Sequence, residues 1–389
     1  MIDQNQPGVA LSASERLQLQ QTSRRALTEL SPMSVARELL DSDSGFNALL
    51  LQKFVELGWS GIHLPETLGG FGSTLGDAAV VISELGRALV GGPFVSSAII
   101  AASTLAAGKN TDLAKHLVPN LVDGSTSATV VIAGGHGHYT GAGLGAKWTP
   151  TADGGGVLDG VSSFVLDANN VEHLIVFSRS ADDVVASVIR RDHPGVTTTA
   201  LALLDQTRRL FEVAFDRVDV AESHVIARGV ELLEYAVEVG AVVMALDSFG
   251  LAQVVVEQTA DYAKQRVQFG RSIGSFQAIK HRLADGVLLV ETSRVAVDHA
   301  AELASLDAAC SREQRGISVS TAKAYVCDAA VKICGDSVQI HGGIGFTWEH
   351  DAHLFLKRAM LNQSLFGTSS WHRRRVADFV VGPAGARQP

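Results

Sequence analysis

The stretch YAKQRVQFGRSIGSFQAIKH, residues 262–281, interrupts the longest helical pattern of the chain with a short turn. Apolar residues recur every three or four positions across residues 228–305, on both sides of this turn, and that period is typical of an α-helix. Arg266 closes the first helix, and Phe269 and Gly270 begin the turn. We therefore expect two long helices whose connection displays a guanidinium beside an aromatic ring.

The chemistry of this turn has two explanations. A guanidinium at Arg266 could bind a pyrophosphate through two hydrogen bonds, with an aromatic ring packed beside it. The helix dipole also favours a basic residue at a helix carboxy terminus without any ligand. The turn alone is consistent with a nucleotide contact and with an ordinary helix end.

Two other glycine-rich segments accompany it. Residues 57–72, LGWSGIHLPETLGGFG, form a loop in which proline ends the preceding element and paired glycines permit a tight turn; such a loop is also a common helix connector. Residues 339–347, QIHGGIGFT, follow a helical run and expose backbone amides where a nucleotide could approach closely. No second ligand is spaced with His341, so we expect no metal site.

The pattern of glycines, prolines and β-branched residues divides the chain into three parts. Helical periodicity prevails in residues 1–125, short β-branched runs separated by Gly, Asp and Asn fill residues 126–228, and strong helical patterns return in residues 229–389. There is no βαβ alternation, which excludes a doubly wound parallel sheet. We expect an α+β multi-domain chain with a helical domain at each end.

The composition narrows the classes of function. The 389 residues are 46% hydrophobic and 19% charged with a net charge of -9, and the basic clusters are short, so we expect no nucleic-acid partner. The three cysteines lack CxxC spacing, which argues against zinc or disulfides. The amino terminus shows no signal pattern and the apolar runs are interrupted, so we expect no membrane insertion and a cytoplasmic location.

Taken together, the three glycine-containing segments, in this order, resemble the acyl-CoA dehydrogenase family over residues 12–378. The resemblance implies an amino-terminal helical domain, a small middle β-barrel and a carboxy-terminal four-helix bundle. It also implies that one set of residues grips the ADP part of an FAD bound mainly by the adjacent subunit. This set is Arg266, Phe269, Gln277, Gln339 and the backbone of Gly342 and Gly343.

The family reaction is the α,β-dehydrogenation of an acyl-CoA thioester, in lipid or sterol side-chain catabolism among others. The resemblance implies that a carboxylate removes the α-proton, that the β-hydrogen leaves as hydride to the flavin, and that an electron-transfer flavoprotein accepts the electrons. Such a base needs a pKa tuned by burial.

The chain departs from the family at the position of this base. The usual glutamate position is occupied by Phe366, and the alternative position on the earlier helix is occupied by Gly240. Glu238 lies two residues away, on a different side of the helix. Asp247 lies two turns beyond Gly240 on the same face. It is a candidate for a relocated base, or else an aspartate satisfied by a neighbouring helix.

The β domain departs as well. The loop that reads TEP.AGSD in the family corresponds to residues 129–138, and the W-I-T/S triplet corresponds to residues 163–166. Phe164 can still pack on a flavin ring, but Leu166 offers no hydrogen bond, and Thr368 remains as a candidate cofactor contact. The chain therefore resembles either a complete enzyme with relocated groups, acting as a homo-oligomer, or the subunit of a heterotetramer that completes the FAD site of a related subunit.

Three other classes remain as alternatives. A flavin-dependent oxidase or monooxygenase on the same fold would use an aspartate near the base position, which Asp247 permits. A nicotinamide-binding turn at residues 141–145, GAGLG, would require a following helix and a downstream acidic residue, which the sequence lacks. A scaffold without a cofactor would leave the ordered set of Arg266, Gln277 and Gln339 without an explanation.

Overall fold

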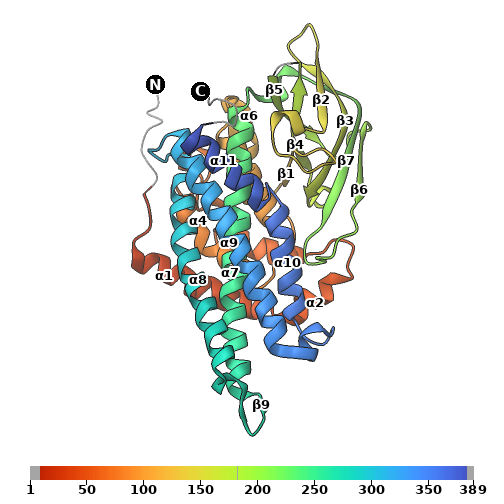
Figure 1. Ribbon diagram of the computed structural model, residues 1–389. Helices are drawn as coiled ribbons and strands as arrows, with labels where there is room; N and C mark the ends of the chain where they lie inside the picture. Colours follow the sequence, from red (N-terminus) through yellow and green to blue (C-terminus); the bar gives the residue numbers. More distant parts are fainter. Residues whose placement is uncertain (1–8, 182, 383–389) are drawn as a thin grey trace, which may run out of the picture.

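The computed structural model describes residues 9–181 and 183–382, and its elements follow the expected order of helical, β and helical segments (Figure 1). This order confirms the predicted fold class. The amino-terminal helices are α1 (Ala13–Leu30), α2 (Met33–Leu40), α3 (Ala48–Glu56), α4 (Leu75–Arg87), the π-helix η3 (Phe94–Ala101), α5 (Ala102–Ala106) and α6 (Thr111–Val122).

The middle domain is a mixed sheet. Its strands are β1 (Ala128–Val131), β2 (Ala146–Pro150), β3 (Gly156–Leu166), β4 (His173–Ser180), β5 (Asp183–Arg190), β6 (Val196–Ala200), β7 (Leu210–Val220) and β8 (Val225–Arg228). The order is β6-β7-β3-β2-β4-β5-β8, with β1 beside β4. No ladder joins β6 to β8 in the described part of the chain, so the expected barrel is an open sheet. Strand β6 is mostly exposed, as suits a sheet edge.

The carboxy-terminal domain is built around α7 (Glu231–Gln265). It continues with the hairpin β9 (Val267–Gln268) and β10 (Arg271–Ser272), then α8 (Gln277–Leu303), α9 (Arg312–His341), α10 (Ala352–Ser364) and α11 (Ser369–Val381). Helix α7 packs against α8, α9 and α10 of this bundle and against α4 of the first domain. It is long and apolar enough to cross a membrane, but 83% of its most apolar window is buried inside the protein, as in the core helix of a folded domain.

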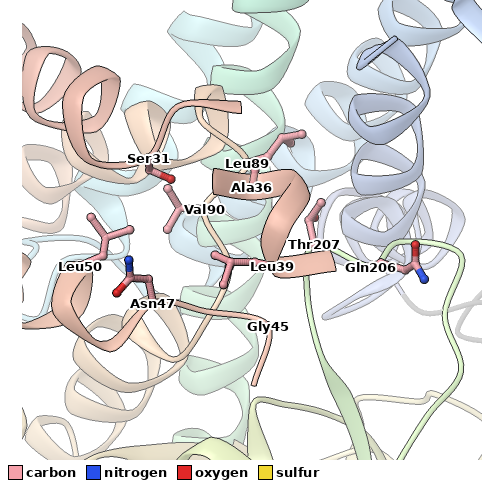
Figure 2. A pocket seen from close by; sticks show the side chains of 11 residues that line it. Ser31, Ala36, Leu39, Gly45, Asn47, Leu50, Leu89, Val90, Gln206 and Thr207 are labelled. Atoms are coloured by element: carbon pink, nitrogen blue, oxygen red, sulfur yellow. The ribbon is translucent and has the colours of Figure 1, made fainter. Parts of the chain in front are cut away.

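Helices α4 and α7 cross in direct backbone contact. A Cβ atom added at Gly250 would lie 1.8 Å from the carbonyl oxygen of Ser83, and one added at Gly86 would lie 2.3 Å from that of Asp247. Only glycine permits this approach. Near the same junction, the crevice between α2, α3 and the end of α4 has a volume of about 10 Å³ (Figure 2), about the space of one water molecule.

Candidate functional site

The two positions at which the family places its base lie against each other. A Cβ atom added at Gly240 would lie 2.3 Å from Cδ1 of Phe366, so the phenylalanine ring occupies the space in front of the glycine. The Phe366 side chain is buried, and its ring stacks on Tyr139 with a centroid distance of 5.5 Å and an angle of 30°. Neither potential base position therefore carries a carboxylate. Gly240 faces the ring of Phe366, and that ring stacks on Tyr139.

Side chains of α9 and α11 hold the loop that carries Phe366. The ammonium of Lys323, which is fully buried, donates to the carbonyl oxygens of Gln363 at 3.2 Å and Gly367 at 3.0 Å. Nε2 of His372 donates to the carbonyl oxygen of Phe366 at 3.0 Å. Burial lowers the pKa of His372 to about 3, so this imidazole stays neutral. These anchors hold Phe366 at a φ of +54°, a conformation that phenylalanine rarely adopts.

The space beside the stack is nearly filled. A cavity of about 10 Å³ remains there, lined by residues that include Ile132, Phe164 and Leu166 from the β domain. Such a cavity holds about one water molecule, so a flavin ring system does not fit within it. Phe164, which is 37% exposed, thus lies beside the stack and lines this small cavity.

Asp247 is not placed as a base. Its carboxylate accepts from Arg208 at 3.0 Å, from Arg358 at 3.1 Å and from Asn362 at 2.6 Å, all in the buried interior. Burial by itself raises the pKa of Asp247, but the charges of Arg358 and Arg208 outweigh it, and the pKa is lowered. The relocated-base hypothesis is therefore wrong on geometry, and the aspartate is a counter-ion satisfied by neighbouring elements.

Glu238 is occupied in the same way. The side chain is fully buried, with Arg315 donating to it at 2.5 Å and Arg375 also donating. It points toward α9 and α11, as its two-residue offset from Gly240 predicted. Neither of the two nearby carboxylates is free to take a proton from a substrate.

Thr368 lies on the other side of the stack. Its hydroxyl accepts from the backbone amide of Trp371 and caps the start of α11. It also lines a hollow of about 260 Å³ together with residues that include His138 and Arg374. The hollow is large enough for part of a ligand, and Tyr139 lines both this hollow and the small cavity.

The second candidate site lies at the far end of the bundle. Arg266 ends α7, Phe269 and Gly270 form the tip of the β9–β10 hairpin, and Gln277 begins α8 (Figure 1). The Phe269 side chain is 93% exposed at a φ of +53°. An aromatic ring held in this strained, solvated position points to a binding role.

The end of α9 completes this site. Gln339 is exposed in the last turn of α9, and the helix passes into the loop at Gly342. Cβ atoms added at Gly342 and Gly343 would have no heavy atom within 4 Å, so their backbone faces open space. The residues Arg266, Phe269, Gln277, Gln339, Gly342 and Gly343 are called the cofactor surface below. Donors and open backbone of this kind can hold the diphosphate of a nucleotide cofactor.

The two sites lie at opposite ends of α7. Arg266 follows Gly240 by 26 positions along this helix, which corresponds to about 39 Å at the rise of an α-helix. Figure 1 shows the β9–β10 hairpin at the end of the bundle remote from the sheet. The cofactor surface and the Tyr139–Phe366 stack are therefore separate sites on one chain.

The whole length of the chain has known relatives. The acyl-CoA dehydrogenase N-terminal domain matches residues 13–125, and the acyl-CoA dehydrogenase C-terminal domain matches residues 227–381. Acyl-CoA dehydrogenase IpdE2 of Mycobacterium tuberculosis is 30% identical over 346 residues, which cover 89% of this chain and 91% of that protein. The chain belongs to the acyl-CoA dehydrogenase family. Its members are oxidoreductases that act on the CH–CH group of acyl-CoA.

Solved structures agree with this assignment. A variant of the Tcur3481-Tcur3483 steroid ACAD superimposes with a TM-score of 0.85 at 25% identity, over 95% of this chain and 98% of that chain. The ChsE4-ChsE5 complex from Mycobacterium tuberculosis superimposes with a TM-score of 0.87 at 23% identity, over 96% of this chain and 99% of that chain. This acyl-CoA dehydrogenase thus keeps the fold although its base positions have changed.

The sequence analysis missed three residues that form or support the Tyr139–Phe366 stack. Tyr139 lies in a glycine-rich loop without periodicity, and Lys323 and His372 lie within ordinary helical patterns. The one available signal was the lysine at an otherwise apolar helical position, because a lysine is almost never fully buried unless its ammonium is paired.

Proposed function

We propose that this chain is the FAD-completing subunit of a heteromeric acyl-CoA dehydrogenase. Its cofactor surface completes the FAD site of a related catalytic subunit, while its own base position carries no chemistry. The observation that supports this most strongly is the Tyr139–Phe366 stack over Gly240, which leaves no carboxylate at either position that the resemblance assigns to the base.

The ionisable groups around Gly240 and Phe366 support the proposal. Removal of an α-proton needs an ionisable group within hydrogen-bond reach of the substrate. Phe366 and Gly240 have none, Asp247 and Glu238 are held by arginines, and the cavity between the stack and the β domain is about 10 Å³. FAD bound by the partner would supply the hydride acceptor. This chain would contribute the Arg266 guanidinium and the open backbone at Gly342 and Gly343.

The substrate and partners follow from the family and from these relatives. We propose an acyl-CoA ester from lipid or steroid side-chain breakdown as substrate, and an electron-transfer flavoprotein as electron acceptor. The steroid ACAD and the ChsE4-ChsE5 complex each have two named components, which supports a heteromer. A complete homo-oligomeric enzyme or a flavin oxidase would need a working carboxylate, and the arginine pairs of Asp247 weigh against both.

The test is a count of flavins per chain. The chain is purified alone and after co-expression with candidate catalytic acyl-CoA dehydrogenase subunits, and flavin absorbance is compared with protein concentration. We expect no retained FAD in the chain alone, and one FAD per two chains in the complex. Addition of an acyl-CoA substrate should bleach the flavin of the complex. One FAD per chain in the protein purified alone would contradict the proposal.

A further inference from the structure

The loop that carries two glycines of the cofactor surface is held at both ends by side chains outside that surface. This cofactor loop, residues 342–348, connects α9 to α10. Along its length the side chains of Ile344, Phe346 and Trp348 are exposed, by 48%, 74% and 59%. Trp348 packs on His353 and Lys357 of α10, and the contacts at the two ends of the loop fix its position relative to α7 and α2.

His341 anchors the first end. Its ring is buried, and Nδ1 donates to the carbonyl oxygen of Ser337 at 2.8 Å. The ring stacks on Tyr262 at a centroid distance of 4.2 Å, and the Tyr262 hydroxyl donates to the carbonyl oxygen of His341 at 3.4 Å. The amide of Arg266 donates to the carbonyl oxygen of Tyr262 at 2.9 Å, one turn along α7. His341 therefore fixes the start of the cofactor loop relative to Arg266.

A second contact between the same two helices lies beneath this stack. The hydroxyls of Thr259 on α7 and Ser337 on α9 are buried and lie 2.7 Å apart. The ends of α7 and α9 are thus joined by a polar pair and an aromatic pair within the last turns before the cofactor surface. This joint sets the spacing between the two segments that form the surface.

Arg37 anchors the other end. It lies on α2 of the amino-terminal domain, more than 300 positions away in sequence. Its Nε donates to Oδ1 of Asp351 at 2.7 Å, and its Nη1 donates to the carbonyl oxygen of Trp348 at 2.6 Å. Since one guanidinium holds both a carboxylate and a backbone carbonyl, a lysine cannot reproduce the contact.

A histidine pair links the first anchor to His350, the residue before Asp351. The ring of His350 lies 4.3 Å from that of His341, and its Nδ1 accepts from the amide of Ala352 at 3.1 Å. This acceptor role leaves Nδ1 of His350 without a proton. The loop is therefore closed into a ring of contacts from Tyr262 through His341 and His350 to the Asp351–Arg37 pair.

We infer that His341 and Arg37 are positioning residues that hold the Gly342–Gly343 backbone in register with Arg266 for the FAD of the partner subunit. This inference rests on the proposed function. Without the anchors, binding of the cofactor would have to order the loop, and that conformational entropy would reduce affinity. Neither residue belongs to the cofactor surface itself.

The test uses the complex purified through an affinity tag on this chain from its native host, stripped of FAD and titrated with FAD. Flavin fluorescence gives the FAD Kd, gel filtration gives the subunit composition, and turnover is measured at saturating FAD. We expect Arg37→Ala and His341→Ala to raise the FAD Kd about tenfold, with unchanged assembly and a turnover number within about twofold of the original. Arg37→Lys and His341→Phe, which keep part of each contact, should raise the Kd less.

Two comparisons separate the possible outcomes. Arg25→Ala removes an arginine of the same domain whose pair with Glu29 is exposed, and it should leave the Kd unchanged. If Arg266→Ala raises the Kd while the Arg37 and His341 variants do not, the positioning role is wrong and the proposed function stands. If none of the three variants raises the FAD Kd, both the positioning role and the proposed function are wrong. Loss of assembly or of the fold in both conservative variants would also overturn the positioning role, since it would assign the residues to stability alone.

Discussion

Phe366 and Gly240 depend on each other. The ring of Phe366 lies where a Cβ atom at position 240 would stand, so any larger residue at 240 must displace the ring. The glycine at 240 thus permits the stack of Phe366 on Tyr139. At this scale the two residues are coupled through packing.

Gly240→Ala should lower the free energy of unfolding by about 1–3 kcal/mol, because the added methyl group overpacks the site. In a Phe366→Ala background, where the opposing ring is absent, the same change should have little effect. Denaturant unfolding of the four proteins of this double-mutant cycle measures the coupling. Additive effects would show that the two residues do not share space.

His63 gives a prediction on pH. It is buried, Nε2 lies 2.9 Å from the Ser103 hydroxyl, and burial lowers its pKa to about 4. The unfolded chain protonates this histidine near pH 6.5. Between these pH values the unfolded state binds more protons, so the free energy of unfolding should fall as pH decreases from about 6.5 to 4.

Protonation of His63 should account for a decrease in the free energy of unfolding on the order of 3 kcal/mol over this pH range. His63→Gln, which keeps a hydrogen-bonding group but does not titrate, should flatten the decline. Denaturant unfolding at a series of pH values measures it. A His224→Gln variant, in which an exposed histidine is removed, is the control and should retain the slope of the original protein.

At the scale of elements, Arg358 joins three parts of the chain. From α10 it reaches Asp247 on α7, the hydroxyl of Thr207 before β7 at 2.5 Å, and the carbonyl oxygen of Val90 after α4 at 2.6 Å. Arg208 completes the pairing at the carboxylate. Since a buried arginine is costly without a counter-ion, Asp247 stabilises the junction of all three domains.

Asp247→Asn should therefore lower the free energy of unfolding by about 3–5 kcal/mol, because it leaves two buried guanidinium groups without their negative partner. The matched control is Asp192→Asn, which removes a carboxylate paired with Arg190 at the surface, and should leave the free energy of unfolding nearly unchanged. Thermal and denaturant unfolding measure both. Equal effects of the two variants would contradict the role of Asp247 as the counter-ion that stabilises the domain junction.

At the scale of the whole molecule, the outer helix α8 exposes three large apolar side chains among its charged ones. Val287, Leu288 and Val295 on α8 are 51%, 62% and 65% exposed, and α8 lies along the outside of the bundle (Figure 1). Contiguous exposed apolar side chains of this kind mark interaction sites. We expect another subunit to cover this face in the assembly.

Leu288→Arg should weaken assembly, because it places a charge within a buried interface. Sedimentation velocity should show a shift to smaller species at the same protein concentration, with an unchanged circular dichroism spectrum. Leu49→Arg alters an equally exposed leucine on α3, 75% exposed, and should leave the assembly intact. If the assembly dissociates in the Leu49→Arg variant, or stays intact in the Leu288→Arg variant, the interface does not lie on this face of α8.

The sequence by itself determined the order of the three domains and the break in the long helix at Arg266, and it predicted the residues of the cofactor surface. These features are local, because helical periodicity, strand composition and the glycines at each turn are readable from neighbouring positions. It also located the two substituted base positions, Phe366 and Gly240, through the motif around each.

Only the tertiary structure decided what fills the site and what holds the cofactor loop. The Tyr139–Phe366 stack, the Asp247–Arg358 pair and the Arg37–Asp351 pair join residues that are 227, 111 and 314 positions apart. No periodicity connects such positions. Burial and charge pairing arise when the domains pack, so the same Asp247 that one helix presents as a candidate base becomes a counter-ion once α10 and the loop before β7 supply two arginines.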